Sequence, residues 1–483
     1  MHQHTALSIE WLNQQARPHL RAALSAGDRS PPEQLAVPPG FSGHDFVIYL
    51  LTIAAEIEHA LMVQYLYSAY SLGGPQVPDK QWATVLEWQN IIFGIAKEEM
   101  GHFITVQNVL RLIGGPLNFQ RQDFPWDSDL IAFPFTLEPL SRGAVAKYVI
   151  AESPNNWGSA ATPAEKVEIE KQATANAGRP VKQVGVLYHY MITLLNDPRV
   201  IPDSAFLTDT LPFQASWDEW GRAYGGPAEA PGQAQRPDLL VRTAYSRASA
   251  VAALQAVAQQ GEAPGEDYDS NQQSHFAKFL AVWKAYPSVA QPTRPVATNP
   301  IVPFDPDLPE VSSLALKAVL KDNAPLTPIS NPVTARWGTL SNLRYRILLN
   351  YLVHSLSLSG PELAQPPNNA RGLLVHSTFG EMYNMRALAG ILVRLPVVGP
   401  PAGELRAGPP FQMPYTLSLP AGEEARWRVH ADLLLAAERL IDRLLPHATE
   451  PQRSYLLATR AADAKTLTAI GTILDSCRPG SRI

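Results

Sequence analysis

A glutamate and a histidine three residues apart, Glu99 and His102, constrain this chain more than any other feature. They lie in the run Ile95-Ala-Lys-Glu-Glu-Met-Gly-His102, and a helix places side chains at this spacing one turn apart on one face. The same face carries four aliphatic residues, namely Ile91, Ile95, Val106 and Val109. A carboxylate among aliphatic side chains is costly unless a cation neutralises it. The spacing therefore predicts a metal ion bound by Glu99 and His102, the alternative being an ordinary hydrogen-bonded or solvated pair.

A second carboxylate, Glu58, lies in an upstream segment that also has helical periodicity. Its run is Ala54-Ala-Glu-Ile-Glu-His-Ala-Leu-Met-Val-Gln-Tyr-Leu-Tyr67, and its face is otherwise formed by Ala55, Leu61, Met62 and Tyr65. Glu56 is a rival, but its face includes Thr52 and His59 and is less apolar. Glu58 is thus predicted to supply the single-glutamate helix that a two-metal site needs beside its Glu-x-x-His helix.

Charge and cysteine content narrow the functional classes. The formal net charge is −5 and no block of Lys or Arg occurs, so nucleic acid is not an expected partner. Cys477 is the single cysteine, which excludes intramolecular disulfides and zinc–thiolate sites and is compatible with a reducing cytoplasm.

Neither a signal peptide nor a membrane span is expected. The start, Met-His-Gln-His-Thr, lacks a basic stretch followed by an apolar core. The most apolar run, 46–66, has Asp45, Glu56, Glu58 and His59 in or beside it, which is too polar for a span. We expect a cytoplasmic protein without a membrane partner.

The 44 prolines are clustered, and long apolar periodic stretches lie between the clusters. This pattern predicts an all-α protein with stiff loops. Two long helices are predicted over 44–72 and over 79–113, with Asp79 as an N-cap; each would be roughly 40–50 Å long. Such helices joined by short Gly-Pro connectors are typical of an antiparallel bundle. Further helices are predicted over 6–25, 141–153, 181–195, 238–260 and 271–286, and no series of strands is expected.

A proline-rich segment, 287–310, is predicted to link two domains. Residues 1–290 would form a metal-binding helical lobe, and residues 310–483 a second all-helical lobe. The helices of the second lobe are predicted over 311–322, 335–358, 368–394, 422–445 and 450–475. Its histidines form no Glu-x-x-His pair and are interpreted as core or surface residues, namely His354, His376 and His430.

A carboxylate-bridged two-metal centre needs about four carboxylates and two histidines from facing helices. The N-terminal lobe supplies that number: Glu58, Glu99, His102, Glu152, Glu262 and His275. For the last three, a helix N-cap, a loop carboxylate and a helix-start histidine are the alternatives. Glu98 is predicted to point elsewhere, because it shares a face with Gly94, Gly101 and Thr105.

The ligand types favour iron or manganese, with zinc as an alternative, because carboxylates and imidazoles occur without thiolates. We expect two iron ions. The aromatic residues near the predicted site either line a pocket for an aromatic substrate or belong to the bundle core; they are Tyr65, Tyr67, Trp88, Tyr148, Tyr188 and Tyr190.

Several of these segments together resemble the ferritin-like domain of the iminophenyl-pyruvate dimer synthase family, which includes large enzymes of the violacein and chromopyrrolate pathways. The matching runs lie within residues 40–285: Ala55-Glu-Ile-Glu-His-Ala-Leu-Met-Val-Gln-Tyr-Leu-Tyr-Ser-Ala-Tyr-Ser71, Lys97-Glu-Glu-Met-Gly-His102 with its stop at Leu110–Gly115, Ile150-Ala-Glu-Ser-Pro154, Gln260-Gly-Glu262 and Ser274-His-Phe276.

The resemblance implies a metal-binding helical bundle that acts in specialised metabolism on aromatic or amino-acid-derived molecules. It places Glu58, Glu99, His102, Glu152, Glu262 and His275 at the metal site. The chain departs from the family in two respects: the dimer synthases are far longer, and Gln259 stands where another Glu is expected before the Gln-Gly-Glu motif. The coupling reaction itself is therefore not transferred.

Three functions remain open at this point. The first is a dimetal oxidoreductase that uses O2 and a small-molecule substrate, with no catalytic residue assigned beyond the metal ligands. The second is a catalyst that dimerises or condenses imino acids, in which the metal is structural or polarises groups. The third is a non-catalytic metal-binding helical protein. A homodimer is expected from the frequency of two-fold assembly.

Overall fold

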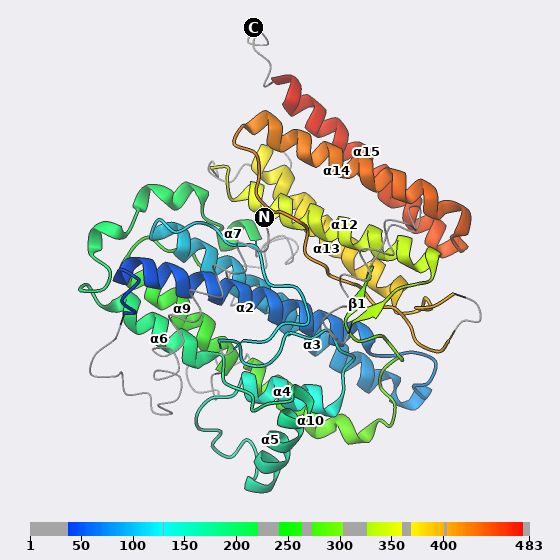
Figure 1. The fold of residues 1–483 in the computed structure, drawn as a ribbon, viewed down its shortest axis with the longest axis horizontal. Coiled ribbons are helices and arrows are strands. Elements are labelled where there is room, and N and C mark those ends of the chain that lie inside the picture. The colour runs from blue at the N-terminus through cyan, green and yellow to red at the C-terminus, as the bar shows by residue number, and fades with distance from the viewer. Residues whose placement is uncertain are drawn as a thin grey trace, which may run out of the picture. The chain divides into compact units, whose positions relative to one another are not determined.

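The computed structural model describes residues 37–128, 130–220, 241–262, 273–302, 326–359, 369–399 and 403–476. Its contacts divide the chain into two compact units (Figure 1). The N-terminal unit comprises the described parts of Met1–Gln122, Trp126–Phe135 and Leu140–Pro292. The C-terminal unit comprises those of Asp123–Pro125, Thr136–Pro139 and Thr293–Ile483. The helices predicted over 6–25 and 311–322, and Cys477, lie outside the described residues.

Two long helices, α2 (Gly43–Ser71) and α3 (Asp79–Leu112), pack against each other in the N-terminal unit. The connection between them turns at Gly73 and Gly74, whose φ angles of 86° and 122° favour glycine. Ser42 caps α2 by accepting from the backbone N–H of Asp45. The predicted N-cap of α3 is wrong by one residue: Pro78 is the cap, and Asp79 is the first helical residue.

Four helices form a ring in which each contacts two neighbours. α2 contacts α3 and α6 (Gly185–Asn196), and α9 (Arg247–Glu262) contacts α3 and α6. α4 (Arg142–Ala151) and α10 (His275–Ala285) pack against each other, and α10 also contacts α3 and α9. The predicted all-α fold with a helical bundle is thereby confirmed.

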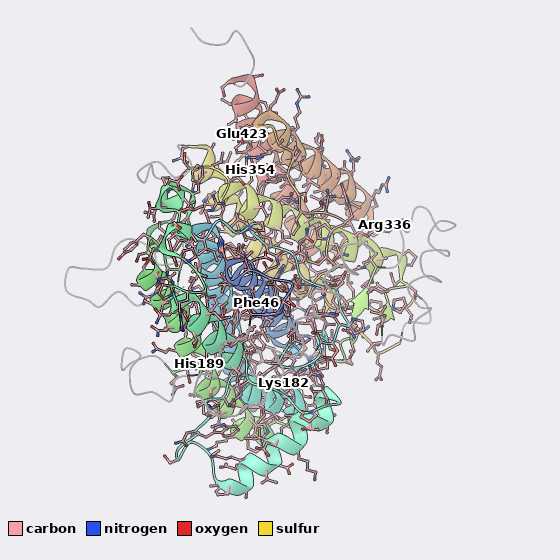
Figure 2. All side chains as sticks on the ribbon, turned by 60° about the vertical axis from the view of Figure 1, so that its left-hand side comes forward. Phe46, Lys182, His189, Arg336, His354 and Glu423 are labelled. Atoms are coloured by element: carbon pink, nitrogen blue, oxygen red, sulfur yellow. The ribbon has the colours of Figure 1, made fainter. Side chains whose placement is uncertain are left out.

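α2 is the most buried element of the bundle. It is apolar around most of its circumference, and Phe46, labelled in Figure 2, is fully buried. It is also the one described helix that has the length and composition of a membrane span, yet 72% of its most apolar window is covered by protein. A helix that is apolar on all sides belongs in a protein core or a bilayer, and here the core accounts for it.

One described helix longer than a single turn was not predicted, α5 (Pro163–Ala177). The face of α5 that packs against the rest of the unit is narrow, because Ile169 and Ala173 are the buried residues of this helix. Its start carries a capping box, in which Thr162 and Glu165 exchange hydrogen bonds, and Gly178 ends it in a left-handed conformation. The sequence pattern that indicates α5 therefore lies in its cap residues rather than in apolar periodicity.

The remaining short elements of the N-terminal unit are the turns η1 (Asp203–Ala205), η2 (Thr208–Phe213) and η3 (Tyr286–Ser288) and the one-turn helix α7 (Trp217–Trp220). In the C-terminal unit, β1 (Pro300–Ile301) and β2 (Thr327–Pro328) form one parallel pair, with Pro300 opposite Thr327. These are the strands found within the described ranges.

Four long helices build the C-terminal unit: α12 (Pro332–Ser355), α13 (Ala370–Leu392), α14 (Glu423–Leu444) and α15 (Glu450–Ser476). The turn η5 (Leu445–His447) follows α14. α12 packs on α13 and α14, and α15 packs on α13 and α14. The predicted second all-helical lobe is confirmed in its described residues.

A buried arginine joins three of these helices. Arg344 of α12 is fully buried and donates from Nη1 to Glu381 Oε1 of α13 at 3.0 Å and to Asp463 Oδ1 of α15 at 2.8 Å. A second bond runs from Nη2 to Asp463 Oδ2. Removing the cation would leave two carboxylates buried without compensation.

We expect Arg344→Met to lower the free energy of unfolding by about 3–5 kcal/mol, because one partner of a buried ion network is lost. Arg428→Met is the control, since Arg428 pairs with Glu424 on the exposed side of α14 and should matter by at most about 1 kcal/mol. Urea unfolding of both variants would measure this. Equal effects of the two substitutions would contradict the prediction.

Two buried histidines face each other across α12 and α14. His354 Nδ1 lies 2.8 Å from His430 Nε2, and His354 Nε2 lies 2.9 Å from Glu423 Oε1. Figure 2 labels His354 and Glu423 on these two helices. Burial, and then the neighbouring His354, lower the pKa of His430 to about 3. His354 and His430 are core residues, as the sequence predicted, and His376 is exposed.

This pair makes stability depend on pH. The folded pKa of His430 lies below its unfolded value of about 6.5, so its contribution is complete above pH 6.5 and is lost as the pH falls toward 3. Between about pH 7.5 and 5.5 the wild type should lose about 1.4 kcal/mol more than His430→Gln. The matched control is His376→Gln, which should follow the wild type in urea unfolding at both pH values. A His430→Gln variant with an unchanged pH dependence would refute the assignment.

Candidate metal centre

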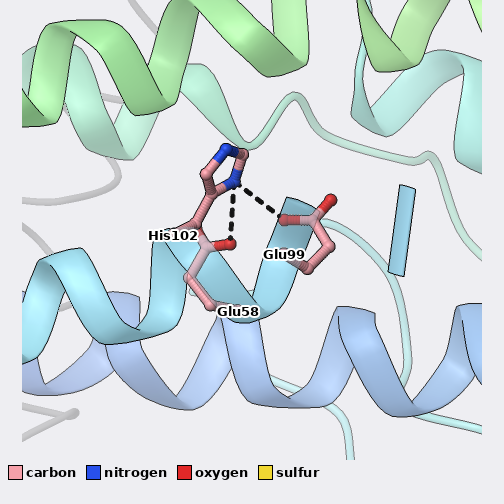
Figure 3. A group of neighbouring side chains, drawn as sticks. All are labelled: Glu58, Glu99 and His102. Atoms are coloured by element: carbon pink, nitrogen blue, oxygen red, sulfur yellow. Dashed lines mark hydrogen bonds and ion pairs between the residues drawn. The ribbon is translucent and has the colours of Figure 1, made fainter. Parts of the chain in front are cut away.

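Three of the predicted ligands meet between α2 and α3. His102 Nδ1 lies 3.0 Å from Glu99 Oε2 and 3.5 Å from Glu58 Oε2 (Figure 3). Each of the three residues is 2% exposed. The helical spacing that places Glu99 and His102 on one face thus also turns that face toward Glu58 of the neighbouring helix.

Glu99 has a second histidine on its other side. Its Oε1 lies 3.0 Å from His275 Nδ1, and the same nitrogen lies 3.7 Å from Glu152 Oε2. The two imidazole rings are 5.5 Å apart and nearly parallel. Glu99 is therefore shared between two groups, Glu58–Glu99–His102 and Glu99–Glu152–His275, each of which brings three ligand atoms within 4.8 Å of one another. We call these position 1 and position 2.

The ends of two helices supply the outer residues of position 2. Glu152 follows the last residue of α4 as its C-cap, and its backbone N–H bonds to Tyr148 O at 3.0 Å. His275 is the first residue of α10, whose N-cap Ser274 accepts from the N–H of Ala277. Gly261 of α9 makes room for Glu152, because a Cβ there would lie 3.0 Å from Glu152 Oε2.

Two tyrosines hold the carboxylates that are not shared. Tyr188 of α6 donates to Glu58 Oε1 at 2.5 Å, and Tyr65 of α2 donates to Glu152 Oε1 at 2.5 Å. Burial raises the pKa of both hydroxyls well above the usual value, so both remain protonated donors. Each carboxylate is thereby left with Oε2 directed to the centre.

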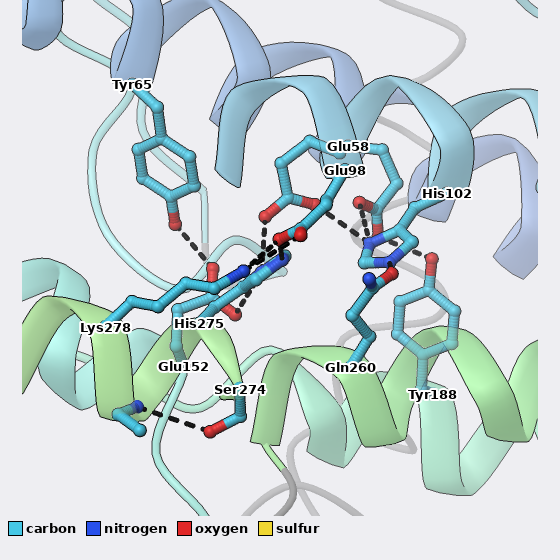
Figure 4. A network of polar contacts seen from close by, with 12 residues as sticks. Glu58, Tyr65, Glu98, His102, Glu152, Tyr188, Gln260, Ser274, His275 and Lys278 are labelled. Carbon is cyan, nitrogen blue, oxygen red and sulfur yellow. Dashed lines mark hydrogen bonds and ion pairs between the residues drawn. The ribbon is translucent and has the colours of Figure 1, made fainter. Parts of the chain in front are cut away.

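The Nε2 atoms of His102 and His275, which point away from Glu99, also have hydrogen-bond partners (Figure 4). His102 Nε2 lies 2.7 Å from Gln260 Oε1 of α9, and His275 Nε2 lies 2.9 Å from Glu98 Oε2. Lys278 donates to both oxygens of Glu98, at 2.8 and 2.6 Å. Glu98 therefore lies outside both three-residue groups and contacts the outer nitrogen of His275 on α10, although it is adjacent to Glu99 in the sequence.

The electrostatics of the cluster favour positive charge. Burial and the charge of Glu99 raise the pKa of Glu58 to about 8. Burial lowers the pKa of His102, but the hydrogen bonds and charges of Glu58 and Glu99 outweigh burial and raise it to about 10. Burial likewise opposes protonation of His275, yet Glu99, Glu152 and Glu98 hold its pKa well above the usual value. Protons are the cations that satisfy these carboxylates when no metal is bound.

The donor set fits a metal ion at each position. Glu58 Oε2, Glu99 Oε1 and His275 Nδ1 are buried and have no hydrogen-bond partner among the described residues. Glu99 Oε1 and His275 Nδ1 face each other at 3.0 Å, and Glu58 Oε2 faces His102 Nδ1 at 3.5 Å, although buried polar groups are ordinarily hydrogen-bonded. Oxygen and imidazole ligands without thiolate suit iron, manganese or zinc.

Five of the six residues predicted as ligands are brought together by the structure: Glu58, Glu99, His102, Glu152 and His275. The sixth, Glu262, is the last residue of α9, and its side chain lies outside the described residues. Sequence reasoning missed Gln260 and Lys278, and it named Tyr188 as a pocket or core residue without its bond to Glu58. Gln260 stands in the Gln-Gly-Glu motif and could have been noticed; Tyr188 and Lys278 had no signal.

The other aromatic residues named from the sequence are buried in the bundle. Tyr148 bonds Ser68 through its hydroxyl at 2.8 Å and packs edge-on against Tyr65. Trp88 stacks on Tyr286 with ring centroids 5.6 Å apart. Tyr67 and Tyr190 are buried as well. These contacts are core packing.

The N-terminal unit is similar to a known protein family. The model of the ferritin-like family matches residues 51–284. This chain carries a ferritin-like domain. The match begins inside α2 and ends inside α10, so it encloses every residue of positions 1 and 2.

Two named relatives confirm the similarity to the dimer synthases. A dichlorochromopyrrolate synthase of Lentzea aerocolonigenes is 33% identical over 119 residues, which are 20% of this chain and 12% of that protein. A 2-imino-3-(indol-3-yl)propanoate dimerase of Chromobacterium violaceum is 31% identical over 129 residues, which are 21% of this chain and 12% of that protein. The similarity thus spans about an eighth of each relative. No solved structure matches the chain.

Proposed function

We propose that positions 1 and 2 form a two-metal centre, occupied by iron, and that the protein catalyses an O2-dependent oxidation of a small molecule. The observation that carries this proposal is the placement of Glu99, whose two oxygens each face the Nδ1 of a different histidine at 3.0 Å. A carboxylate so placed can bridge two ions, as in di-iron bundles. Manganese and zinc are the alternatives.

The charges of the cluster support two cations rather than one. Glu58, Glu99 and Glu152 bring three carboxylates into a site that is at most 5% exposed, and Lys278, at its edge, is paired with Glu98. Two divalent ions would neutralise these carboxylates and replace the protons otherwise held there. When bound, redox-active ions would pass electrons from the substrate, which is oxidised, to O2, which is reduced.

The residues of this chain would orient and shield that chemistry. Tyr188 and Tyr65 fix the rotation of Glu58 and Glu152, and the surrounding aliphatic and aromatic core excludes bulk water. We propose an aromatic or amino-acid-derived substrate, because the two relatives are named for chromopyrrolate formation and for an indolyl imino acid. Location in the cytoplasm and assembly as a homodimer are part of this proposal.

A second candidate is the dimerisation or condensation of imino acids. The names of the two relatives favour it, since one is a dimerase of an imino acid. In that case the same centre would serve a structural or polarising role, and product would form without O2. A metal-binding protein without catalysis is the third candidate.

Anaerobic titration with Fe(II), followed by exposure to O2, tests the proposal. Wild-type protein should bind two irons per chain and consume O2. Glu99→Gln should bind iron at least about tenfold more weakly, because the shared oxygens lose their charge. The matched control is Glu87→Gln, on the exposed side of α3, which should behave as the wild type.

The outcomes separate the candidates. Two irons with O2 uptake, both lost in Glu99→Gln, support the oxidoreductase. Product formed from an imino acid at an unchanged rate without O2 would replace it with the condensing enzyme. Failure of the wild type to bind Fe(II), Mn(II) or Zn(II) above background would refute the metal centre.

A further inference from the structure

Positions 1 and 2 have the same kinds of described residues around them, with one difference. Each has one unshared carboxylate, one oxygen of Glu99, one histidine Nδ1, and one tyrosine that holds the unshared carboxylate. The difference lies behind the histidines. His102 has the neutral amide of Gln260 behind it, whereas His275 has the carboxylate of Glu98.

When a metal takes the place of the extra proton and each ring is neutral, these outer partners fix which nitrogen carries the remaining proton. The amide oxygen of Gln260 only accepts, so His102 Nε2 donates to it and Nδ1 keeps its lone pair. The carboxylate of Glu98 only accepts, so the same holds for His275. Both rings therefore direct Nδ1 lone pairs toward Glu99, which is the form a metal requires.

The charge of the acceptor makes the two rings unequal. A hydrogen bond from an N–H to a carboxylate is charge-assisted and stronger than one to a neutral amide. It shifts electron density onto the ring and makes the opposite nitrogen a better ligand. Lys278 keeps Glu98 in the charged form and in place, because its ammonium donates to both carboxylate oxygens. His275 should therefore bind a metal more strongly than His102.

On the basis of the proposed function, we infer that position 2 is the tighter metal site and fills first, with Glu98 as the positioning residue of His275 and Gln260 as that of His102. Glu98 is 15% exposed by its side chain, and it lies outside the three-residue group of either position. It would act on the metal through the imidazole.

Titration of the metal-free full-length protein with Co(II), followed by visible absorption and by calorimetry, tests this inference. Wild type should show two binding steps whose dissociation constants differ by about 10–100-fold, the usual effect of an outer partner. Glu98→Gln should weaken the tight step alone by that factor, since both histidines would then face amides. Gln260→Glu should strengthen the weak step and leave the tight step unchanged.

The pair of reciprocal variants keeps the test decisive. A Glu98→Gln variant that binds in two unchanged steps, or that loses both steps equally while remaining folded by circular dichroism, would overturn the inference. If Glu98→Gln does not fold, Gln260→Glu still decides, because an unchanged weak step contradicts the proposed role of the acceptor. Wild type that binds no Co(II) would refute the metal centre itself, whereas two equal steps would refute only the inequality.

Discussion

The N-terminal unit depends on the neutralisation of three carboxylates that its own fold buries. Glu58 lies on a helix that is apolar around most of its circumference, and Glu99 and Glu152 reach the same interior. Apolar packing of α2 and α3 and the burial of these charges occur together, so the fold carries an electrostatic cost of several kcal/mol per uncompensated ion. Protonated histidines offset that cost in the metal-free protein, and cations would do so in the form we propose to be active.

The C-terminal unit also buries carboxylates, and an arginine of the same unit pairs with them. Arg344 satisfies Glu381 and Asp463 from within the chain, and that network has no open ligand atom of the kind found at Glu58 and Glu99. The carboxylates of the C-terminal unit are therefore paired with a permanently charged arginine, whereas those of the N-terminal unit face imidazoles. This contrast is the physical reason why we propose the metal centre in the N-terminal unit.

The site residues differ in how well the sequence predicts them. Glu58, Glu99 and His102 follow from helical periodicity, because the residues that decide their burial are neighbours in sequence. Glu152 and His275 required a resemblance, since each lies at a helix end and reaches the centre through tertiary packing. Tyr188 and Gln260 meet their partners across more than a hundred residues, and no local pattern records such contacts. The helix α5 was missed for a different reason, as its caps rather than its apolar stripe define it.

The order in which the site residues occur along the chain has a consequence for biosynthesis. Glu58 is made early, and His275 is made after the four bundle helices have all been translated. Until α3 and α6 have been made, α2 lacks its partners in the ring, and until His275 has been made, Glu99 lacks one of its two imidazoles. Non-local closure of this kind is slow and exposes intermediates that aggregate. A nascent chain of this protein would accordingly expose the apolar surface of α2 until α3 and α6 pack on it.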